Sequence, residues 1–197
     1  MMDDPDSTRQ SLLARIHDPQ DREAWAEFVE LYTPFVYNLV RRRGLQPADA
    51  ADVTQDVMRS VFSSLGRFQH NQRPRSFRTW LVTIARRRLS DFRSRQGKQI
   101  PGSGNTGIMG LLHEQSVSAD EEAEIEREYQ QRLFQWAVDQ IRHDFRDSTW
   151  QAFWRTYVDG ESCESVAEQL QLSREAVYMA RSRVLSSLRK RIREVEE

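Results

Sequence analysis

Hydrophobic residues recur every three or four positions along most of this chain, and that period predicts helices rather than strands. A first helix is predicted between start signals at Asp18, Pro19 and Asp21 and a stop at Gly44, with Pro34 expected to kink or break it. Its buried face is predicted to consist of Trp25, Phe28, Val29, Tyr32, Phe35, Val36, Leu39 and Val40.

Two further helices are predicted before the pattern stops. The second opens after Pro47 and ends near Gly66, and the third covers about 77–94, with a polar loop at 69–76 between them. Their predicted apolar stripes are Val53, Val57, Val61, Phe62 and Leu65 in the second helix, and Phe77, Leu81, Ile84, Ala85, Leu89 and Phe92 in the third.

Residues 97–118 are rich in glycine and have no periodicity, which predicts a flexible linker. Helical patterning returns near Ala119. The sequence therefore predicts an all-α fold in which two small helical domains, at 8–96 and 119–197, are joined by this linker.

The most specific local pattern is that of a helix-turn-helix beginning at Ser165. Small or apolar residues occupy the positions where two crossing helices pack, and Ser173 is placed to cap the second helix. Gln171 stands at the turn, where glycine is commonest because the backbone often has a positive φ. An ordinary helical hairpin without a DNA role is the alternative. The predicted inward residues are Val166, Ala167, Leu170, Leu172, Val177 and Ala180, and the predicted exposed face is Arg174, Glu175, Tyr178, Met179 and Ser182.

Charge is segregated along the chain although its net value is −1. Arginines are concentrated at 73–98 and again at 174–193, whereas 120–128 is acidic. Two basic blocks in a neutral chain favour a polyanionic partner at two places, and solvated helix faces are the alternative. The acidic segment is positioned to repel DNA or to shield basic surface.

Several classes of function are disfavoured. No apolar run reaches the roughly 18 residues of a membrane span, and the acidic start lacks the features of a signal peptide, so a cytoplasmic protein without membrane insertion is expected. The lone Cys163 is interpreted as a packing residue. We expect no enzyme, no catalytic residue, no metal and no cofactor, because no glycine motif cradles a phosphate and the histidines are dispersed. These are His17, His70, His113 and His143.

Three motifs in order resemble the extracytoplasmic-function (ECF) sigma factors. They are ADVTQDV at 51–57, FRTWLVTIARRRLSDFR at 77–93, and YVDGES at 157–162 before the helix-turn-helix. The resemblance implies a region two at 8–96 and a region four at 119–197. It further implies an alternative sigma factor that binds core RNA polymerase and directs promoter-specific initiation. A stand-alone helix-turn-helix regulator is the alternative.

The resemblance also implies roles for individual residues. Asp52, Gln55 and Asp56 match the face that docks on polymerase, although solvated polar residues would give the same pattern. Phe77 and Trp80 are more typical of a core than of base stacking, because aromatic residues at helical spacing are usually buried. Arg87 stands where many relatives carry asparagine. The expected partners are both large polymerase subunits, duplex and melted promoter DNA, and an anti-sigma factor. The residues implied to bind the minus-ten element are Asn71, Arg73, Arg75, Arg78, Trp80, Arg86, Arg87 and Arg88, and those for the minus-thirty-five element are Ser173, Arg174, Glu175, Tyr178, Met179, Arg181, Arg183 and Lys190.

Overall fold

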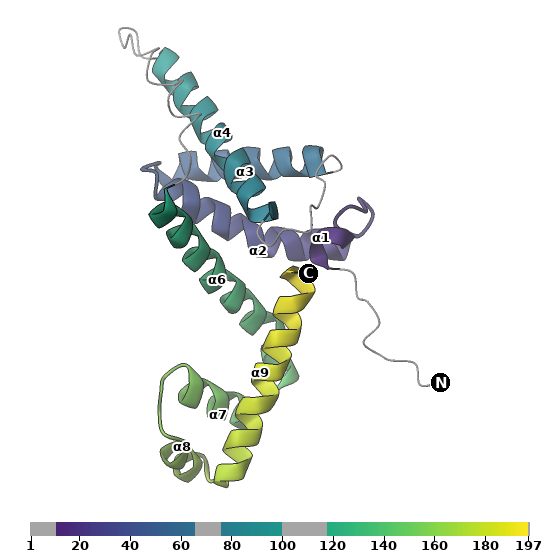
Figure 1. Cartoon of the computed structure of the whole chain (residues 1–197), viewed down its shortest axis with the longest axis vertical. Coiled ribbons are helices and arrows are strands. Elements are labelled where there is room, and N and C mark those ends of the chain that lie inside the picture. Colours follow the sequence, from purple (N-terminus) through teal and green to yellow (C-terminus); the bar gives the residue numbers. More distant parts are fainter. Residues whose placement is uncertain (1–10, 66–75, 100–117, 197) are drawn as a thin grey trace. The chain divides into compact units, whose positions relative to one another are not determined.

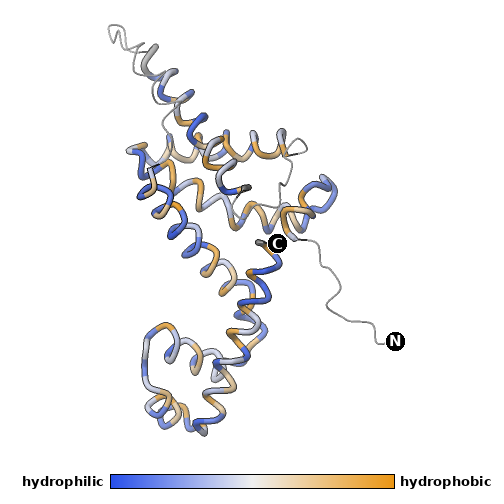
Figure 2. The backbone as a smooth tube through the Cα atoms, in the orientation of Figure 1, coloured by the Kyte–Doolittle hydropathy of each residue, from blue (hydrophilic) through white to orange (hydrophobic). Residues whose placement is uncertain are grey.

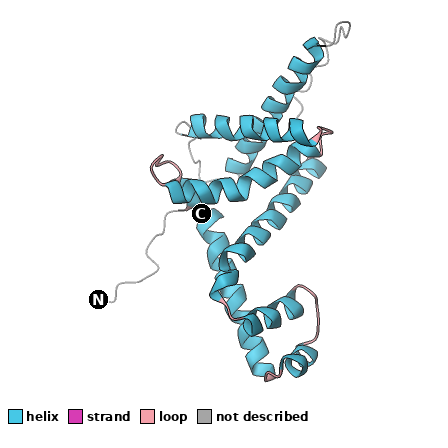
Figure 3. Cartoon of the chain, turned by 180° about the vertical axis from the view of Figure 1, so that it is seen from behind, coloured by secondary structure: helices cyan, strands magenta, loops and turns pink. Residues whose placement is uncertain are grey.

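The computed structural model describes residues 11–65, 76–99 and 118–196, and throughout these ranges the chain forms helices and loops without strands (Figure 3). The predicted all-α class is confirmed. In chain order the helices are α1 (Leu12–Arg15), α2 (Arg22–Arg41), α3 (Pro47–Ser64), α4 (Ser76–Gln99), α6 (Ala119–Ile141), the 3-10 helix η2 (Arg142–Asp144), α7 (Asp147–Tyr157), α8 (Cys163–Leu170) and α9 (Arg174–Glu196) (Figure 1).

Two compact units make up the chain. One is the continuous segment Pro19–Gln130, and the other combines Met1–Asp18 with Gln131–Glu197. The division falls inside α6, so the first half of that helix belongs with α2, α3 and α4. The predicted domain limits, 8–96 and 119–197, remain a prediction about independently folding domains.

Helix α2 begins and ends where its sequence signals are. The Asp21 carboxylate accepts a hydrogen bond from the Ala24 amide at 2.9 Å, and Gly44 adopts a φ of 87° just beyond the end. Of the predicted kink or break at Pro34, the break is wrong, because α2 runs through this residue as one helix, and the kink stays a prediction. Buried side chains on both sides of the proline stabilise the helical path despite the missing amide donor. They are Leu31, Tyr32, Phe35 and Val36.

Helices α2, α3 and α4 pack around one core. Two residues of the predicted stripes face solvent instead, since Val29 is 48% and Phe62 is 59% exposed. Phe62 packs one face against Trp25, with ring centroids 4.9 Å apart. Helix α4 is longer than predicted and continues to Gln99, into the segment expected to be linker. The core includes Phe28, Phe35, Val53, Val57, Val61, Phe77, Leu81, Ala85 and Leu89.

The second unit is built from the remaining helices. Helices α7, α8 and α9 pack against one another, and α1 packs on α9 with Leu12 and Ile16 buried. Along α9, hydrophobic residues alternate with hydrophilic ones at the spacing of a half-buried helix (Figure 2). None of the helices in the described ranges combines the length and apolar character that crossing a membrane requires.

Candidate nucleic-acid interface

The turn between α8 and α9 fixes the geometry of the helix-turn-helix. Gln171 adopts the left-handed conformation, with φ 53° and ψ 42°, as the sequence predicts for this turn. The Leu172 amide donates to the Ala167 carbonyl at 2.9 Å and the Gln171 amide to the Glu168 carbonyl at 3.3 Å. These two bonds form a Schellman motif, which ends α8 and turns the chain toward α9.

A small apolar core holds the two helices together. Val166 and Val177 are fully buried, and Leu170, Leu172 and Cys163 pack at its edge, so the interpretation of Cys163 as a packing residue is confirmed. The remaining members are small, which allows the helix backbones to approach closely. They are Ala152, Ala167 and Ala180.

The start of α9 is capped as predicted. The Ala176 amide donates to Ser173 Oγ at 3.1 Å. The pKa of Glu175 is lowered because backbone amide and Ser173 hydroxyl donors favour the ionised carboxylate. Negative charge is favourable at this end of a helix. Glu175 is therefore an ionised acceptor on the first turn of α9.

The residues predicted on the exposed face of the helix-turn-helix lie on the solvent face of α9. Tyr178 is 54% and Met179 is 52% exposed. Arg174 and Glu175 are exposed beside them, with Arg174 3.3 Å from Glu164. Three more basic residues are implied to bind the minus-thirty-five element. Of these, Arg183 and Lys190 are exposed, whereas Arg181 is half-buried with its guanidinium 5.4 Å from the Tyr157 ring centroid.

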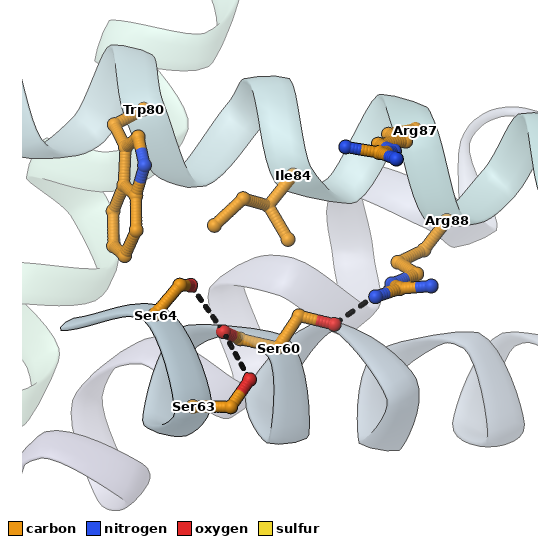
Figure 4. A pocket seen from close by; sticks show the side chains of 7 residues that line it. All are labelled: Ser60, Ser63, Ser64, Trp80, Ile84, Arg87 and Arg88. Atoms are coloured by element: carbon orange, nitrogen blue, oxygen red, sulfur yellow. Dashed lines mark hydrogen bonds between the residues drawn. The ribbon is translucent and has the colours of Figure 1, made fainter. Parts of the chain in front are cut away.

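A second candidate surface is a pocket between α3 and α4 (Figure 4). Its volume is about 400 Å³, and Trp80, Ile84 and Arg87 of α4 face it at helical spacing. Arg88 Nε donates to Ser60 Oγ at 2.7 Å, which holds that guanidinium at the edge of the pocket. The residues on the α3 side are Ser60, Ser63 and Ser64.

The chemistry of this pocket suits a planar or anionic group. An indole and an aliphatic side chain provide stacking surface, and two guanidiniums provide positive charge. The three serine hydroxyls donate to backbone carbonyls of α3, so they offer a ligand acceptor oxygens only. The expectation that aromatic residues of this helix serve the core is confirmed for Phe77, which is 3% exposed. Trp80 is half-buried and contributes both to packing, 5.4 Å from the Phe77 ring, and to the pocket wall.

Two predicted DNA-binding arginines face away from this pocket. Arg78 Nη1 lies 2.7 Å from both carboxylate oxygens of Glu126, and its guanidinium lies 4.3 Å above the Tyr129 ring. Arg86 lies 2.6 Å from Glu121. The sequence treats the arginines of α4 as one basic track, whereas the described ones divide between two faces. Asn71, Arg73 and Arg75 lie outside the described residues.

Sequence reasoning missed two further arginines, at the end of α2. Arg42 lies 2.6 Å from Glu124 and 3.6 Å from Glu128, and Arg43 pairs with Glu121. The available signal was the run Arg41-Arg42-Arg43 directly before Gly44. These pairs place the predicted acidic segment against basic surface of its own chain.

Burial shifts the pKa values of several groups in this network. Burial lowers the pKa of Arg43, with the charge of Arg93 as a further cause, and burial together with Arg43 lowers the pKa of Arg86. Burial also raises the pKa of Glu128, which Arg42 only partly offsets. Like charges are therefore crowded here, and the acidic residues relieve their repulsion.

The predicted polymerase-docking residues lie on α3, away from its buried stripe. Asp52 and Gln55 are exposed. Asp56 is half-buried and lies 3.6 Å from both Arg59 and Arg95. Two of the three side chains are thus accessible to a partner, and the third is held in an ion-pair network.

Comparison with known proteins identifies the α2–α4 segment. A model of sigma-70 region 2 matches residues 28–99, which begin within α2 and include all of α3 and α4. Residues 28–99 are therefore similar to a sigma-70 region 2 domain. This match supports the predicted region two, and the pocket, Asp52 and Gln55 all lie inside the matched residues.

A curated relative supports the same conclusion. The chain is 34% identical over 81 residues to the ECF RNA polymerase sigma factor RpoE of Cereibacter sphaeroides. The alignment covers 41% of this chain and 44% of the relative, so the chain matches less than half the length of that protein. The resemblance to the ECF sigma factors is confirmed for the matched part of the chain.

Proposed function

We propose that this protein is an alternative sigma factor of the ECF type, which binds core RNA polymerase and directs it to specific promoters. The observation that carries the proposal is the pairing of a sigma-70 region 2 domain with a helix-turn-helix in a separate compact unit of the same chain. A protein of this kind works by binding rather than by catalysis.

The region 2 domain supplies two of the proposed contacts. Asp52 and Gln55 on α3, with Asp56 beside them, bind the large subunit of polymerase through carboxylate and amide groups. The pocket between α3 and α4 receives unstacked bases of the melted minus-ten strand, with Trp80 as a stacking surface. Arg87 and Arg88 bind the backbone of that strand. Asn71, Arg73 and Arg75 contribute from the loop before α4.

The helix-turn-helix supplies the third contact, with duplex DNA at the minus-thirty-five element. Its exposed face can enter the major groove, where Arg174 is suited to guanine and Glu175 to the amino group of cytosine. Tyr178 and Met179 provide apolar contacts in the same groove. Ser173, Arg181, Arg183 and Lys190 fix the helix on the phosphates.

Tethering makes these contacts effective together. Each unit makes a small interface alone, and covalent connection raises the effective concentration of the second contact once the first has formed. Polymerase would space the units so that one reads duplex DNA while the other holds melted bases. Regulation by an anti-sigma factor and a cytoplasmic location are parts of the same proposal.

In-vitro transcription with core polymerase tests the proposal. A genomic template library is transcribed with and without the protein, and the transcript starts are sequenced. New starts that share two upstream elements are the expected result. If core polymerase is not bound and no new start appears, while the protein alone binds duplex DNA tightly, the stand-alone regulator is the correct assignment.

A further inference from the structure

The first half of α6 covers an arginine surface on the region 2 domain. We define this surface as Arg42, Arg43, Arg78 and Arg86, and the acidic half of α6 as residues 119–130. Every arginine of the surface lies within ion-pair distance of a carboxylate from this half-helix. The pairs are Arg42 with Glu124 and Glu128, Arg43 and Arg86 with Glu121, and Arg78 with Glu126.

The carboxylates follow from the helical period. Glu121, Glu124 and Glu128 are spaced by three and four residues, so they line one face of α6. Tyr129 anchors the same half-helix, because its ring stacks on Tyr32 with centroids 6.0 Å apart and the two hydroxyls lie 3.4 Å from each other. Tyr129 also packs edge-to-face on Phe35, so the acidic half of α6 is docked by the aromatic contacts of Tyr129 and a set of ion pairs.

The arginine surface has the character of an anion site that a carboxylate occupies. Arg43 and Arg86 converge on the single Glu121 carboxylate, and the Arg93 guanidinium lies nearby, donating to the Arg43 carbonyl at 2.6 Å. Several guanidiniums around one anion are the arrangement that binds phosphate. The Glu121 carboxylate stands where a phosphate would be held.

The ion pairs at the rim are open to exchange. Arg42 and Glu124 are 51% and 56% exposed, and pairs so exposed to water and salt stabilise a structure only weakly. Arg78 and Glu126 are more enclosed, at 15% and 25%. A flexible polyanion that offers several phosphates at once can therefore compete with the half-helix, first at the rim.

We propose that the acidic half of α6 is an intramolecular competitor for nucleic acid, which occupies the arginine surface until phosphates displace it. The inference rests on the proposed function only in choosing nucleic acid as the polyanion. In the free protein the carboxylates of the half-helix neutralise the arginine surface, so non-specific binding of nucleic acid is suppressed. Displacement exposes all four arginines together, so nucleic acid gains several phosphate contacts.

Hydrogen exchange on the unaltered protein gives the first test. Amide exchange is compared with and without a saturating, random-sequence single-stranded DNA and no polymerase. Faster exchange in peptides covering 119–130 is expected, because an isolated half-helix of this length is marginal in water. Unchanged or slower exchange there, with DNA bound, overturns the proposal.

A pair of variants gives the second test. Glu121→Gln with Glu126→Gln removes two carboxylates from the arginine surface, and Asp120→Asn with Glu122→Gln removes the same charge from exposed positions on the same helix. Binding of random-sequence single-stranded DNA is measured by fluorescence anisotropy over a range of salt concentrations. Circular dichroism checks that both variants keep their helices.

The salt dependence decides between competition and a purely structural role. In the first variant Arg43, Arg78 and Arg86 no longer have to be freed from carboxylates before phosphates reach them, so it binds DNA more tightly than the unaltered protein does. The gain is largest at low salt, where the removed ion pairs are strongest. As salt rises from about 50 to 200 mM, the ion pairs of the unaltered protein weaken, so its affinity falls less steeply than that of the variant and the two affinities converge. Equal slopes in the two variants overturn the proposal. Because no polymerase or promoter is present, this result is independent of the transcription test.

Discussion

Truncation of Val177 tests whether α9 is placed as described. This side chain is fully buried in the core of the helix-turn-helix, and Val177→Ala removes two methyl groups. Their lost burial costs about 0.8 kcal/mol each. The neighbouring alanines are too short to fill the gap, so a cavity of roughly 40 Å³ adds about 1 kcal/mol at 24 cal/mol per Å³. The expected loss of stability is about 2.5 kcal/mol.

Met179 provides the matched control two positions along the same helix. It is 52% exposed, so Met179→Ala is expected to change stability by no more than about 0.5 kcal/mol. The same change should weaken binding of duplex promoter DNA, since Met179 lies on the face proposed to enter the groove. The two truncations therefore separate the fold of α9 from its reading surface.

The measurement must report on the helix-turn-helix itself, because the chain has two compact units and a global signal mixes them. Hydrogen exchange of peptides from α7–α9 provides this. The opening constant is expected to rise roughly 70-fold for Val177→Ala, since every 1.4 kcal/mol is a factor of ten. An equal effect of Met179→Ala, or a cost below about 1 kcal/mol for Val177→Ala, would refute the register assigned to α9.

Three other outcomes are expected. Burial raises the pKa of Glu128 above its ordinary 4.5, so its contribution to stability is present at low pH and lost as the pH rises through the folded-state pKa. In urea titrations from about pH 4 to 7, Glu128→Gln should gain stability relative to the unaltered protein, and a constant difference contradicts this. Lys190→Ala should reduce the slope of log K against log salt for duplex DNA by about 1 without changing sequence preference. Arg174→Ala should instead relax the preference at one base pair. Competition assays with altered promoter sequences distinguish the two variants. Asp52→Arg should abolish binding to core polymerase in a pull-down while leaving the helical content unchanged, and retention of binding would remove Asp52 from the docking face.

The helix-turn-helix could be predicted in detail because its constraints are local. The positive φ at Gln171 and the cap at Ser173 both follow from short-range backbone requirements. The inward positions follow from the three-and-four spacing within two adjacent helices. A single sequence contains all of this information, so the local geometry agrees with the expectation.

The partners of the acidic segment could not be predicted in the same way. The sequence shows the acidic run and the arginines, but an unpaired charged helix face has the same pattern as a paired one. The ion pair of Arg43 with Glu121 joins residues far apart in the chain, and its formation depends on how α6 packs on α2 and α4. Charge segregation indicated the two surfaces, and only tertiary structure shows that they meet.

Helix α4 illustrates a second limit. The hydrophobic period predicts that the apolar stripe and the arginines lie on different sides of the helix. It does not predict that the arginines themselves lie on two separate faces. Arg87 lines the pocket toward α3, whereas Arg86, one residue earlier, faces the acidic half of α6. A step of about 100° around the helix separates the two side chains, and the neighbours that occupy each direction are set by long-range packing.

The packing of α1 on α9 has a consequence for how the protein folds during synthesis. Pro19–Gln130 is one continuous segment, so all of its residues, including both sides of the arginine surface, are made before α7, α8 and α9. Leu12 and Ile16 are made earlier, but their partner helix is the last in the described chain. At about 5–20 residues per second, α1 waits roughly 3–13 s after Gln130 is made before the end of α9 follows. The unit that carries the helix-turn-helix therefore becomes complete only after every residue of the other unit has been made.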